Sequence, residues 1–418
     1  MRKLLGITLG IMTALGGFVD FGQIVFTLQA GASFRYSLLW PVVLGTMGII
    51  VYMEMCGRIA VVAREPVFAI VRNRLGKALG LAVLVASNLL NLITFAAELG
   101  GLAIVLHFLT GLPEKLLLVV AAVAIGFIVA LLQFQWIERI FGLAGVTMVV
   151  AAVSAYLLGP DWKALAHGMI PAFSMGETHQ TLRYWYFAVG IFSAMLMEYE
   201  VHFYSSGAIE EDWSEKDLPE NFMVASFGSV LGALLTVALL AIGALVFFPR
   251  HSFPQQLGSA ISGIATPFHR TGYVLVLFGT LACLAGAAVE TMLSGGYNLC
   301  QFYNLPWGKN RKARDVPAFS LSWISVLVIG ALLVLSGLDP LKLVNISVVF
   351  GMVVMPLTYY PIMRVAMDSG VMKRHVNSRT DTAVGILFLI LITMAALAAI
   401  PLMILTDSGQ PWHPGASA

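Results

Sequence analysis

The chain is poor in charge. Aspartate, glutamate, lysine and arginine together make up 11% of its 418 residues, against roughly a quarter in a soluble globular domain. Hydrophobic residues make up 59%, and the mean hydropathy is +0.88. This composition excludes an ordinary soluble domain. It predicts an all-α, polytopic membrane protein whose surroundings are the lipid bilayer.

Cysteine and blocks of like charge are also scarce. Cys56, Cys283 and Cys300 lie in or beside apolar segments without the spacing of metal ligands, so we expect neither a disulfide framework nor a zinc site. The net charge is only +2, and no basic run points to nucleic acid as a partner. Motifs for a nucleophile with its base, or for phosphate binding, are missing. We therefore expect no enzyme and no resident cofactor.

Eleven apolar stretches are long enough to cross a bilayer, which takes about 20 residues each. They lie near residues 4–31, 37–60, 79–110, 114–134, 138–159, 184–208, 221–248, 271–298, 317–337, 341–364 and 382–405. Residues 1–406 are expected to form one transmembrane domain. The polar tail 407–418, rich in proline and glycine, is expected to be disordered.

The placement of lysine and arginine predicts the orientation. Of the 24 such residues, 17 fall on the side of the amino end. Basic residues concentrate on the cytoplasmic side of membrane proteins. The amino end is therefore expected in the cytoplasm and the chain in a bacterial plasma membrane, as a monomer or a weak oligomer.

Two predicted spans, five apart, are interrupted by polar residues. The first carries Asp20 and Gln23, and the sixth carries Glu198, Glu200 and His202. An ionisable residue at mid-span marks an ion or substrate path by default. Paired interruptions are typical of transporters built from two inverted five-helix repeats. We therefore expect repeats near 4–159 and 184–364, followed by an extra helix near 382–405.

Several motifs resemble the NRAMP family of divalent-metal transporters. The strongest are QAGA at 29–32 and YSLLW at 36–40. DFGQ at 20–23 stands where the family has Asp-Pro-Gly-Asn, and AMLMEY at 194–199 where it has Ala-x-x-Met-Pro-His. The resemblance implies an inverted-repeat fold with broken helices 1 and 6, which moves a divalent cation by alternating access. Both family prolines are missing, so we expect flexibility at the breaks to come from Gly16, Gly17, Gly22, Gly190 and Gly207.

The resemblance also implies a set of ligands for the cation, which is the substrate. The set comprises Asp20, the amide oxygen of Gln23, the backbone carbonyl of Ala194 and the thioether of Met197. A soft sulfur ligand favours manganese or ferrous iron over magnesium and calcium. Glu198 replaces a family proline. If it faces the cavity, it adds a hard ligand and favours a strongly hydrated ion such as magnesium, or a different coupling scheme. If it faces another helix, it pairs with a neighbour or stays protonated.

Coupling to protons is a further implication of the resemblance, along Asp20 and Glu98. Tyr199 stands where the family has a histidine, so His202, one turn further on, is the candidate relay. An ordinary hydrogen-bonded interior histidine is the alternative for His202. Glu290 lies among small residues and is a candidate second ion or proton site.

Two alternative functions remain open, and one acidic residue has a structural interpretation. One is transport of magnesium or another hard cation without protons by the same fold, and the other is transport of an amino acid together with a cation. The acidic centre disfavours the carboxylate of an amino acid. Glu54 is followed by Arg58 four residues later, which predicts a structural ion pair on one helix face.

Overall fold

The computed structural model describes residues 19–173, 175–268 and 270–406. Within these ranges the chain forms helices and no strand. Nine of the described helical segments are long and apolar enough to span a membrane. They are α3 (Leu39–Val62), α4 (Val67–Thr110), α5 (Glu114–Leu131), α6 with α7 (Phe134–Gly145 and Val149–Leu157), α11 (Leu218–Ile242), α13 (Arg270–Tyr303), α14 (Pro317–Leu335), α15 (Pro340–Ala366) and α17 (Arg379–Leu405).

These nine segments match the predicted second to fifth and seventh to eleventh spans. The predicted first span is represented by α2 (Phe21–Phe34), and its part before residue 19 lies outside the described residues. The predicted sixth span is divided into α9 (Thr178–Ala194) and α10 (Glu198–Glu210). The all-α polytopic fold is confirmed, and the sixth helix is broken although the family proline is absent.

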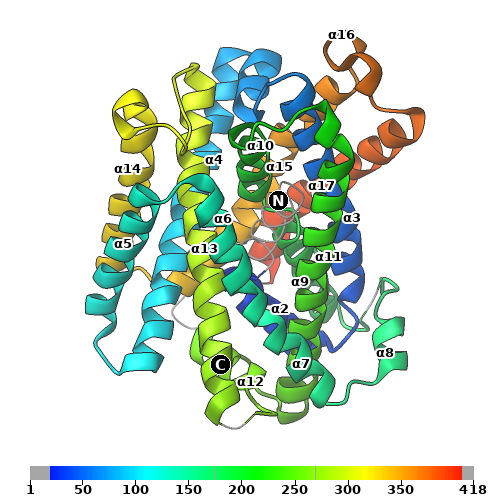
Figure 1. Ribbon diagram of the computed structural model, residues 1–418. Coiled ribbons are helices and arrows are strands. Elements are labelled where there is room, and N and C mark those ends of the chain that lie inside the picture. Colours follow the sequence, from blue (N-terminus) through cyan, green and yellow to red (C-terminus); the bar gives the residue numbers. More distant parts are fainter. Residues whose placement is uncertain (1–18, 174, 269, 407–418) are drawn as a thin grey trace.

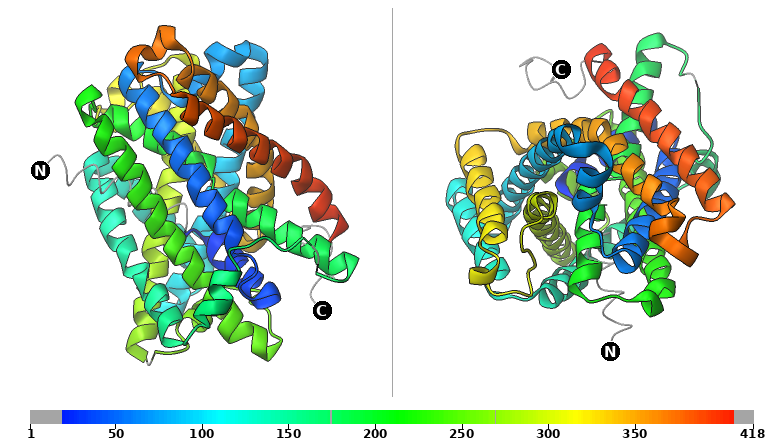
Figure 2. Two further views of the ribbon diagram at one scale, coloured as in Figure 1. Left: turned by 90° about the vertical axis from the view of Figure 1, so that its right-hand side faces the viewer. Right: turned by 90° about the horizontal axis from the view of Figure 1, so that it is seen from above.

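The short, interrupted helices lie inside the bundle and the long helices surround them. Figure 1 shows α5 and α14 along one side and α3, α11 and α17 along the other, with α2, α9 and α10 between them. Helix α2 packs against α9 and α11, whereas α4 packs against α13 and α15. The view from above in Figure 2 shows the same arrangement. The interruptions are therefore enclosed by protein, as non-helical backbone at membrane depth requires.

Close backbone contact holds α2 in this interior position. A Cβ atom on Gly31 would lie 2.1 Å from the carbonyl oxygen of Leu240 in α11. A Cβ on Gly243 would lie 2.3 Å from the carbonyl oxygen of Leu28. Only glycine permits such an approach, and small residues are the usual means by which membrane helices pack closely. This contact explains the glycine of the QAGA motif.

The three described glycines that were expected at the helix breaks lie within helices instead. Gly22, Gly190 and Gly207 lie inside α2, α9 and α10, so the prediction that they loosen the chain there was wrong. Gly190 instead makes room for a ring, since a Cβ there would lie 2.3 Å from Cζ of Phe26. Gly16 and Gly17 lie outside the described residues.

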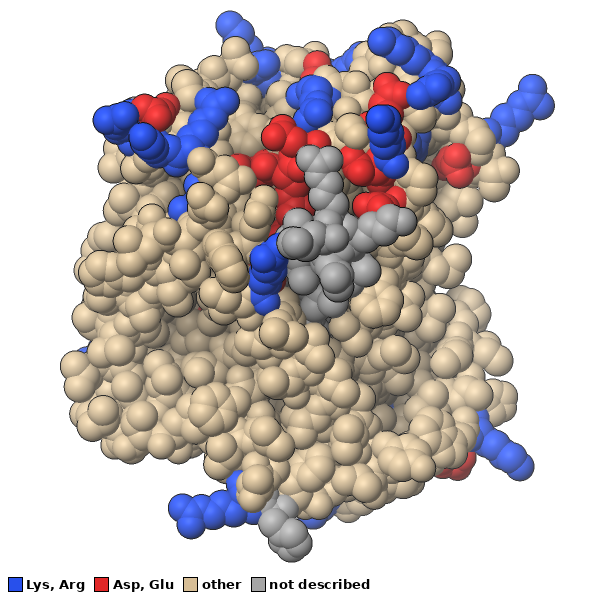
Figure 3. Space-filling view, in the orientation of Figure 1, with Lys and Arg blue, Asp and Glu red and all other residues tan. Residues whose placement is uncertain are grey.

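Charged side chains gather at the two ends of the bundle. Figure 3 shows most lysines and arginines at the top, a broad band without charge below them, and a smaller charged group at the bottom. We call the top the basic end; there α4 begins, α13 ends and α17 begins (Figure 1). The short helix α16 (Ser369–Met372) lies at this end, whereas α8 (Trp162–His167) and α12 (Leu257–Ile264) lie at the other.

Ion pairs connect the segments of the basic end. The predicted pair of Glu54 and Arg58 is present, with Oε1 and Nε 2.8 Å apart. Arg74 of α4 contacts Asp368, before α16, at 3.1 Å. The backbone N–H of Gly370 and the Arg74 guanidinium lower the pKa of Asp368. These surface contacts fix loops at the level where the bundle meets water.

Candidate functional site

Asp20 contacts both the start of α2 and the start of α10. It precedes the first residue of α2, and its Oδ1 accepts a hydrogen bond from the backbone N–H of Gln23 at 2.6 Å. This is the usual geometry of an N-cap. Its Oδ2 accepts a hydrogen bond of 3.1 Å from the hydroxyl of Tyr199, in the first turn of α10. Asp20 is only 2% exposed. The carboxylate predicted as the central ligand therefore lies where α2 and α10 begin.

Glu98 provides a second carboxylate at the same helix start. Its Oε1 and Oε2 accept hydrogen bonds from the backbone N–H of Phe21 at 3.1 and 3.3 Å. Glu98 comes from the middle of α4 and is fully buried. The first N–H groups of a helix lack partners within the helix, and the helix dipole is positive there. The start of α2 thus stabilises negative charge at both Asp20 and Glu98.

Gln23 presents an amide oxygen that has no partner within the described part of the chain. Its Nε2 donates to Oγ1 of Thr236 in α11 at 3.3 Å and lies 3.6 Å from Sδ of Met195. The side chain is fully buried, and Oε1 makes no hydrogen bond to any described residue. The contacts of the amide nitrogen therefore orient the amide and leave its oxygen without a described partner. Thr236 and Met195 had not been singled out from the sequence.

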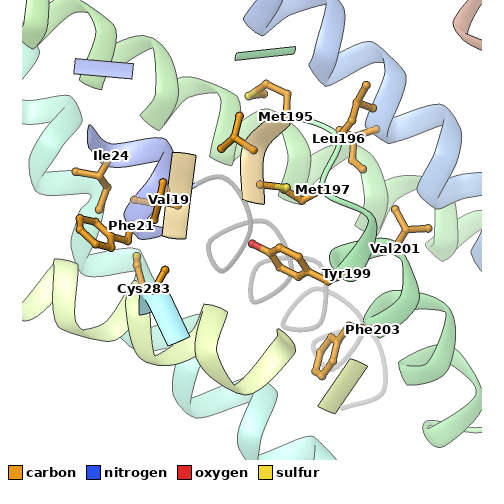
Figure 4. Close-up of a cluster of buried hydrophobic side chains, with 14 of the residues drawn as sticks. Val19, Phe21, Ile24, Met195, Leu196, Met197, Tyr199, Val201, Phe203 and Cys283 are labelled. Atoms are coloured by element: carbon orange, nitrogen blue, oxygen red, sulfur yellow. The ribbon is translucent and has the colours of Figure 1, made fainter. Parts of the chain in front are cut away.

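The second interruption supplies a carbonyl and a thioether. Helix α9 ends at Ala194 and α10 begins at Glu198, and the three residues between them are not helical. Figure 4 shows Met197 on this segment, with its sulfur directed toward Val19, the residue before Asp20. The last carbonyls of a helix lack intrahelical partners and carry its negative partial charge. The break therefore places Ala194 and Met197 near the start of α2.

Glu198 is directed to a different helix. Its Oε2 accepts a hydrogen bond from Oγ1 of Thr358 in α15 at 3.4 Å, and Oε1 makes no hydrogen bond to any described residue. Glu198 is fully buried in the first turn of α10. An acid in the first turn offsets the positive end of the helix dipole. Of the two orientations considered for Glu198, contact with another helix is the one present.

The other residues predicted for coupling lie between α10 and α13. Oγ of Ser294 donates to the carbonyl of Tyr199 at 3.0 Å, which places Glu290, one helical turn earlier, beside the break. Both carboxylate oxygens of Glu290 and both ring nitrogens of His202 lack hydrogen-bond partners among the described residues. His202 packs edge-on against Phe68, with ring centroids 5.1 Å apart. His202 is therefore not a hydrogen-bonded core histidine within the described chain.

A polar stripe on α4 was missed from the sequence. Ser87, Asn91 and Thr94 recur at helical spacing toward Glu98, and all are buried. The Ser87 and Thr94 hydroxyls and the Asn91 amide have no partner among the described residues. Buried polar groups in membrane spans are costly and are usually satisfied by water or by a transported species. The spacing i, i+4, i+7, i+11 was the available signal.

The described residues offer no cage of charged ligands. No group of three or more His, Cys, Asp or Glu side chains among them is placed to hold a metal ion. The ligands expected from the sequence are one carboxylate, one amide oxygen, a backbone carbonyl and a thioether, and Glu98 lies behind them at the same helix start. Such a mixed set can replace much of a cation's hydration without trapping it, as transport requires.

Comparisons with known proteins agree on the family. The model of the family "Nramp: Natural resistance-associated macrophage protein-like" matches residues 10–401. The "Divalent metal cation transporter MntH 1" of Pseudomonas aeruginosa is 24% identical over 409 residues, which cover 92% of this chain and 89% of that protein. The MntH of Deinococcus radiodurans is 24% identical over 384 residues, covering 88% and 83%.

Solved structures show the same fold. The Eremococcus coleocola manganese transporter, in complex with an aromatic bis-isothiourea substituted compound, matches with a TM-score of 0.73 at 20% identity. The match covers 98% of this chain and 89% of that one. MhsT in complex with L-phenylalanine matches with a TM-score of 0.65 at 16% identity, covering 96% and 98%. The family match spans nearly the whole sequence and the resemblance predicted from the motifs is confirmed, so this chain is a member of the Nramp family of integral membrane proteins.

Proposed function

We propose that this chain transports a divalent metal cation across the membrane by alternating access. One observation carries the proposal: Asp20 meets both helix interruptions, through the N–H of Gln23 on one side and the hydroxyl of Tyr199 on the other. A cation bound at Asp20 would contact two segments that can move relative to each other. The names of the MntH relatives support the substrate class.

Manganese or ferrous iron is the cation that the ligands favour. Met197 supplies a soft sulfur, and Gln23 supplies one unpartnered amide oxygen. Thioether ligands select for transition metals, whereas magnesium and calcium prefer oxygen alone. The contact of Glu198 with Thr358 supports leaving this acid out of the ligand set, although it was a candidate ligand from the sequence. Transport of magnesium is the second candidate, and it requires Glu198 to turn toward Asp20.

Proton coupling is proposed for the residues around the site. Glu98, Tyr199, His202 and Glu290 lie on three helices that surround Asp20, and the oxygens of Glu290 and nitrogens of His202 have no described partner. The polar stripe on α4 continues from Glu98 toward the basic end. Such a series of polar groups can carry protons if water enters it. Metal-driven acidification of the vesicle lumen tests this: Glu98→Gln should reduce proton entry more than metal entry, and equal losses would oppose coupling.

The placement in the cell follows from the charge distribution. The basic end contains most of the lysines and arginines (Figure 3), and such residues mark the cytoplasmic side. We propose a plasma-membrane protein with this end in the cytoplasm, acting as a monomer or a weak oligomer and built from the two repeats defined above. Labelling of single cysteines by a membrane-impermeant reagent checks the orientation; reaction at the basic end from outside intact cells would reverse it.

The main test is uptake of Mn²⁺ into vesicles that contain the purified protein and a metal-quenched dye. Asp20→Ala removes the only carboxylate proposed as a ligand and is expected to abolish uptake. Asp161→Ala is the matched control, because Asp161 is also an N-cap aspartate, of α8, and lies exposed far from the site. Unchanged uptake in Asp20→Ala would exclude the proposed site.

Competition between cations separates the two candidates. Excess Mg²⁺ should leave Mn²⁺ uptake nearly unchanged if Met197 is a ligand. Glu198→Gln should then have little effect on Mn²⁺ affinity, since its carboxylate faces Thr358. Strong inhibition by Mg²⁺ that disappears in Glu198→Gln would favour the magnesium transporter instead.

A further inference from the structure

A cleft at the basic end lies outside the transport site. It has a volume of about 470 Å³ and opens between α3, α11, the segment 375–377 and the start of α17. We call it the α3–α17 cleft. Figure 2 shows α17 crossing α3 on this face of the bundle. The residues that line it are Ile50, Val51, Glu54, Met55, Arg58, Phe222, His375, Val376, Asn377, Asp381 and Val384.

The lining changes from polar to apolar with depth. Glu54 and Arg58 lie in the last turns of α3, and Ile50 and Val51 lie one turn further from its end. Asp381 lies in the first turn of α17, and Val384 follows about one turn deeper. One turn advances about 5.4 Å along the helix axis. The polar part is therefore at the level of lipid headgroups, and the apolar part is at the level of acyl chains.

The positive charges of the cleft are already paired. Arg58 donates to both carboxylate oxygens of Glu54, to the carbonyl of His375 and to Oδ1 of Asn377. The His375 ring contacts Glu215 at 3.2 Å. No cation of the described chain is therefore free to receive a phosphate in the cleft lining, which argues against an anionic headgroup.

Asp381 is the one charged group of the lining without an ion-pair partner among the described residues. Its Oδ2 accepts a hydrogen bond from the backbone N–H of Ser378 at 3.1 Å, within the capping box that begins α17. The described ion pairs of the basic end involve other acids. The unpaired carboxylate at the mouth is complementary to a cationic group, above an apolar floor.

We propose that the α3–α17 cleft binds one aminophospholipid, with its primary ammonium at Asp381 and its acyl chains against Ile50, Val51, Phe222 and Val384. Phe222 is 57% exposed, so it can cover an acyl chain without rearrangement. Burial of apolar surface supplies most of the affinity, and the ammonium contact selects the headgroup. This proposal does not depend on which cation is transported.

Native mass spectrometry of the detergent-purified protein tests the proposal. Phosphatidylethanolamine, phosphatidylcholine and phosphatidylglycerol with identical acyl chains are titrated separately, and the first bound lipid is counted. Phosphatidylethanolamine is expected to be retained at about fivefold lower concentration than the other two, which is the upper range for an exposed ion pair. Equal retention of all three, or preference for phosphatidylglycerol, would overturn the proposal.

Two substitutions at Asp381 separate its charge from its role in folding. Glutamate and glutamine both suit the third position of a capping box, so Asp381→Glu and Asp381→Gln should both preserve the start of α17. Asp381→Glu is expected to keep the fivefold preference, and Asp381→Gln to lose it. Asp315→Asn, at an exposed acid that pairs with Arg314, is the control and should change nothing. A preference that survives in Asp381→Gln would contradict the assignment.

A bulky side chain in the apolar part of the α3–α17 cleft tests whether the acyl chains of the lipid bind there. Val384→Trp places a large ring in the cleft and is expected to weaken the first binding event for phosphatidylethanolamine at least fivefold. The thermal unfolding temperature, measured on the same samples, shows that the variant remains folded. Unaltered binding by a folded Val384→Trp protein would place the lipid elsewhere.

Discussion

The two helix interruptions satisfy their backbones in different ways. At the start of α2, two carboxylates accept backbone N–H groups: Asp20 from Gln23, and Glu98 from Phe21. At the start of α10, the residue in the cap position is Met197, which makes no side-chain hydrogen bond to the helix. Two acids, Glu198 and Glu200, follow in the first turn. The start of α2 is therefore capped by carboxylates, and the start of α10 has no side-chain cap.

In the proposed site, this difference would give the two breaks different roles in holding a cation. The first break would contribute charge, stabilised by the start of a helix. The second would contribute the uncharged end of α9 and a thioether. Among the described residues, Asp20 is the acid that contacts both breaks, so a cation bound there would be held by one strong electrostatic contact and several weaker ones. A site of this kind binds and releases readily.

The largest expected effect comes from removing charge at the first break while keeping its cap. Asparagine is as good an N-cap as aspartate, so Asp20→Asn should preserve the start of α2. We expect Mn²⁺ affinity to fall about 100-fold, because loss of one charged partner in a buried contact costs about 2–5 kcal/mol. Isothermal titration of the purified protein measures this.

Asp20→Ala provides the comparison for the cap itself. It removes both the charge and the hydrogen bond to Gln23, and we expect an additional loss of about 1 kcal/mol in unfolding free energy. If Asp20→Asn bound Mn²⁺ like the unmodified protein while Asp20→Ala did not, the role of Asp20 would be structural. Thermal unfolding of the two variants supplies the stability difference.

The second break is tested through its sulfur. Met197→Leu keeps the volume and removes the thioether, so we expect affinity for Mn²⁺ and Cd²⁺ to fall about tenfold relative to Mg²⁺. Met148→Leu is the matched control, at a fully buried methionine between α6 and α7 that takes no part in the proposed site. Equal changes for soft and hard cations in Met197→Leu would remove Met197 from the ligand set.

The sequence was sufficient for the fold because the apolar spans are long. A run such as α13 or α15 has no other stable conformation in lipid, where every backbone group must be bonded internally. Asp20 and the break after Ala194 were also predictable, since polar residues within apolar spans are rare and the motif at 29–32 identified the family. The position of the second break follows the motif AMLMEY and not the nearby glycines.

Contacts between distant segments could not be predicted in the same way. Thr236 and Gln23 are 213 residues apart in sequence, and a threonine in an apolar helix usually bonds to its own backbone. The capping of Phe21 by Glu98 depends on how α4 packs beside α2. The direction of Glu198 toward Thr358 likewise requires the position of α15. The spacing of residues along one helix predicts which of them share a face. Which residues of other helices contact that face depends on tertiary packing.

A smaller effect on Mn²⁺ uptake is expected from the contact between Thr236 and the side-chain amide of Gln23. Thr236→Val keeps the shape of the side chain and removes the hydroxyl that contacts Gln23 Nε2 at 3.3 Å. The amide then loses one of its two contacts, so we expect the KM for Mn²⁺ uptake to rise about threefold to tenfold, the cost of one neutral hydrogen bond. Uptake at several Mn²⁺ concentrations measures it. An unchanged KM would mean that Gln23 needs no support from α11.

The smallest effect on Mn²⁺ affinity is expected from the contact that attaches the end of α9 to α15. Oγ of Ser193 donates to the carbonyl of Val348 at 2.7 Å, which attaches the last turn of α9 to α15. Ser193→Ala should cost about 1 kcal/mol in unfolding free energy. Mn²⁺ affinity should stay nearly constant, because Ala194 and Met197 are held by the helices on either side. Ser229→Ala, a buried serine of α11 that contacts only the sulfur of Met53 in the described bonds, is the control. If Ser193→Ala instead lowered Mn²⁺ affinity as strongly as Met197→Leu, the break between α9 and α10 would depend on its attachment to α15. The contrast between the charged break and the uncharged break would then have to include α15.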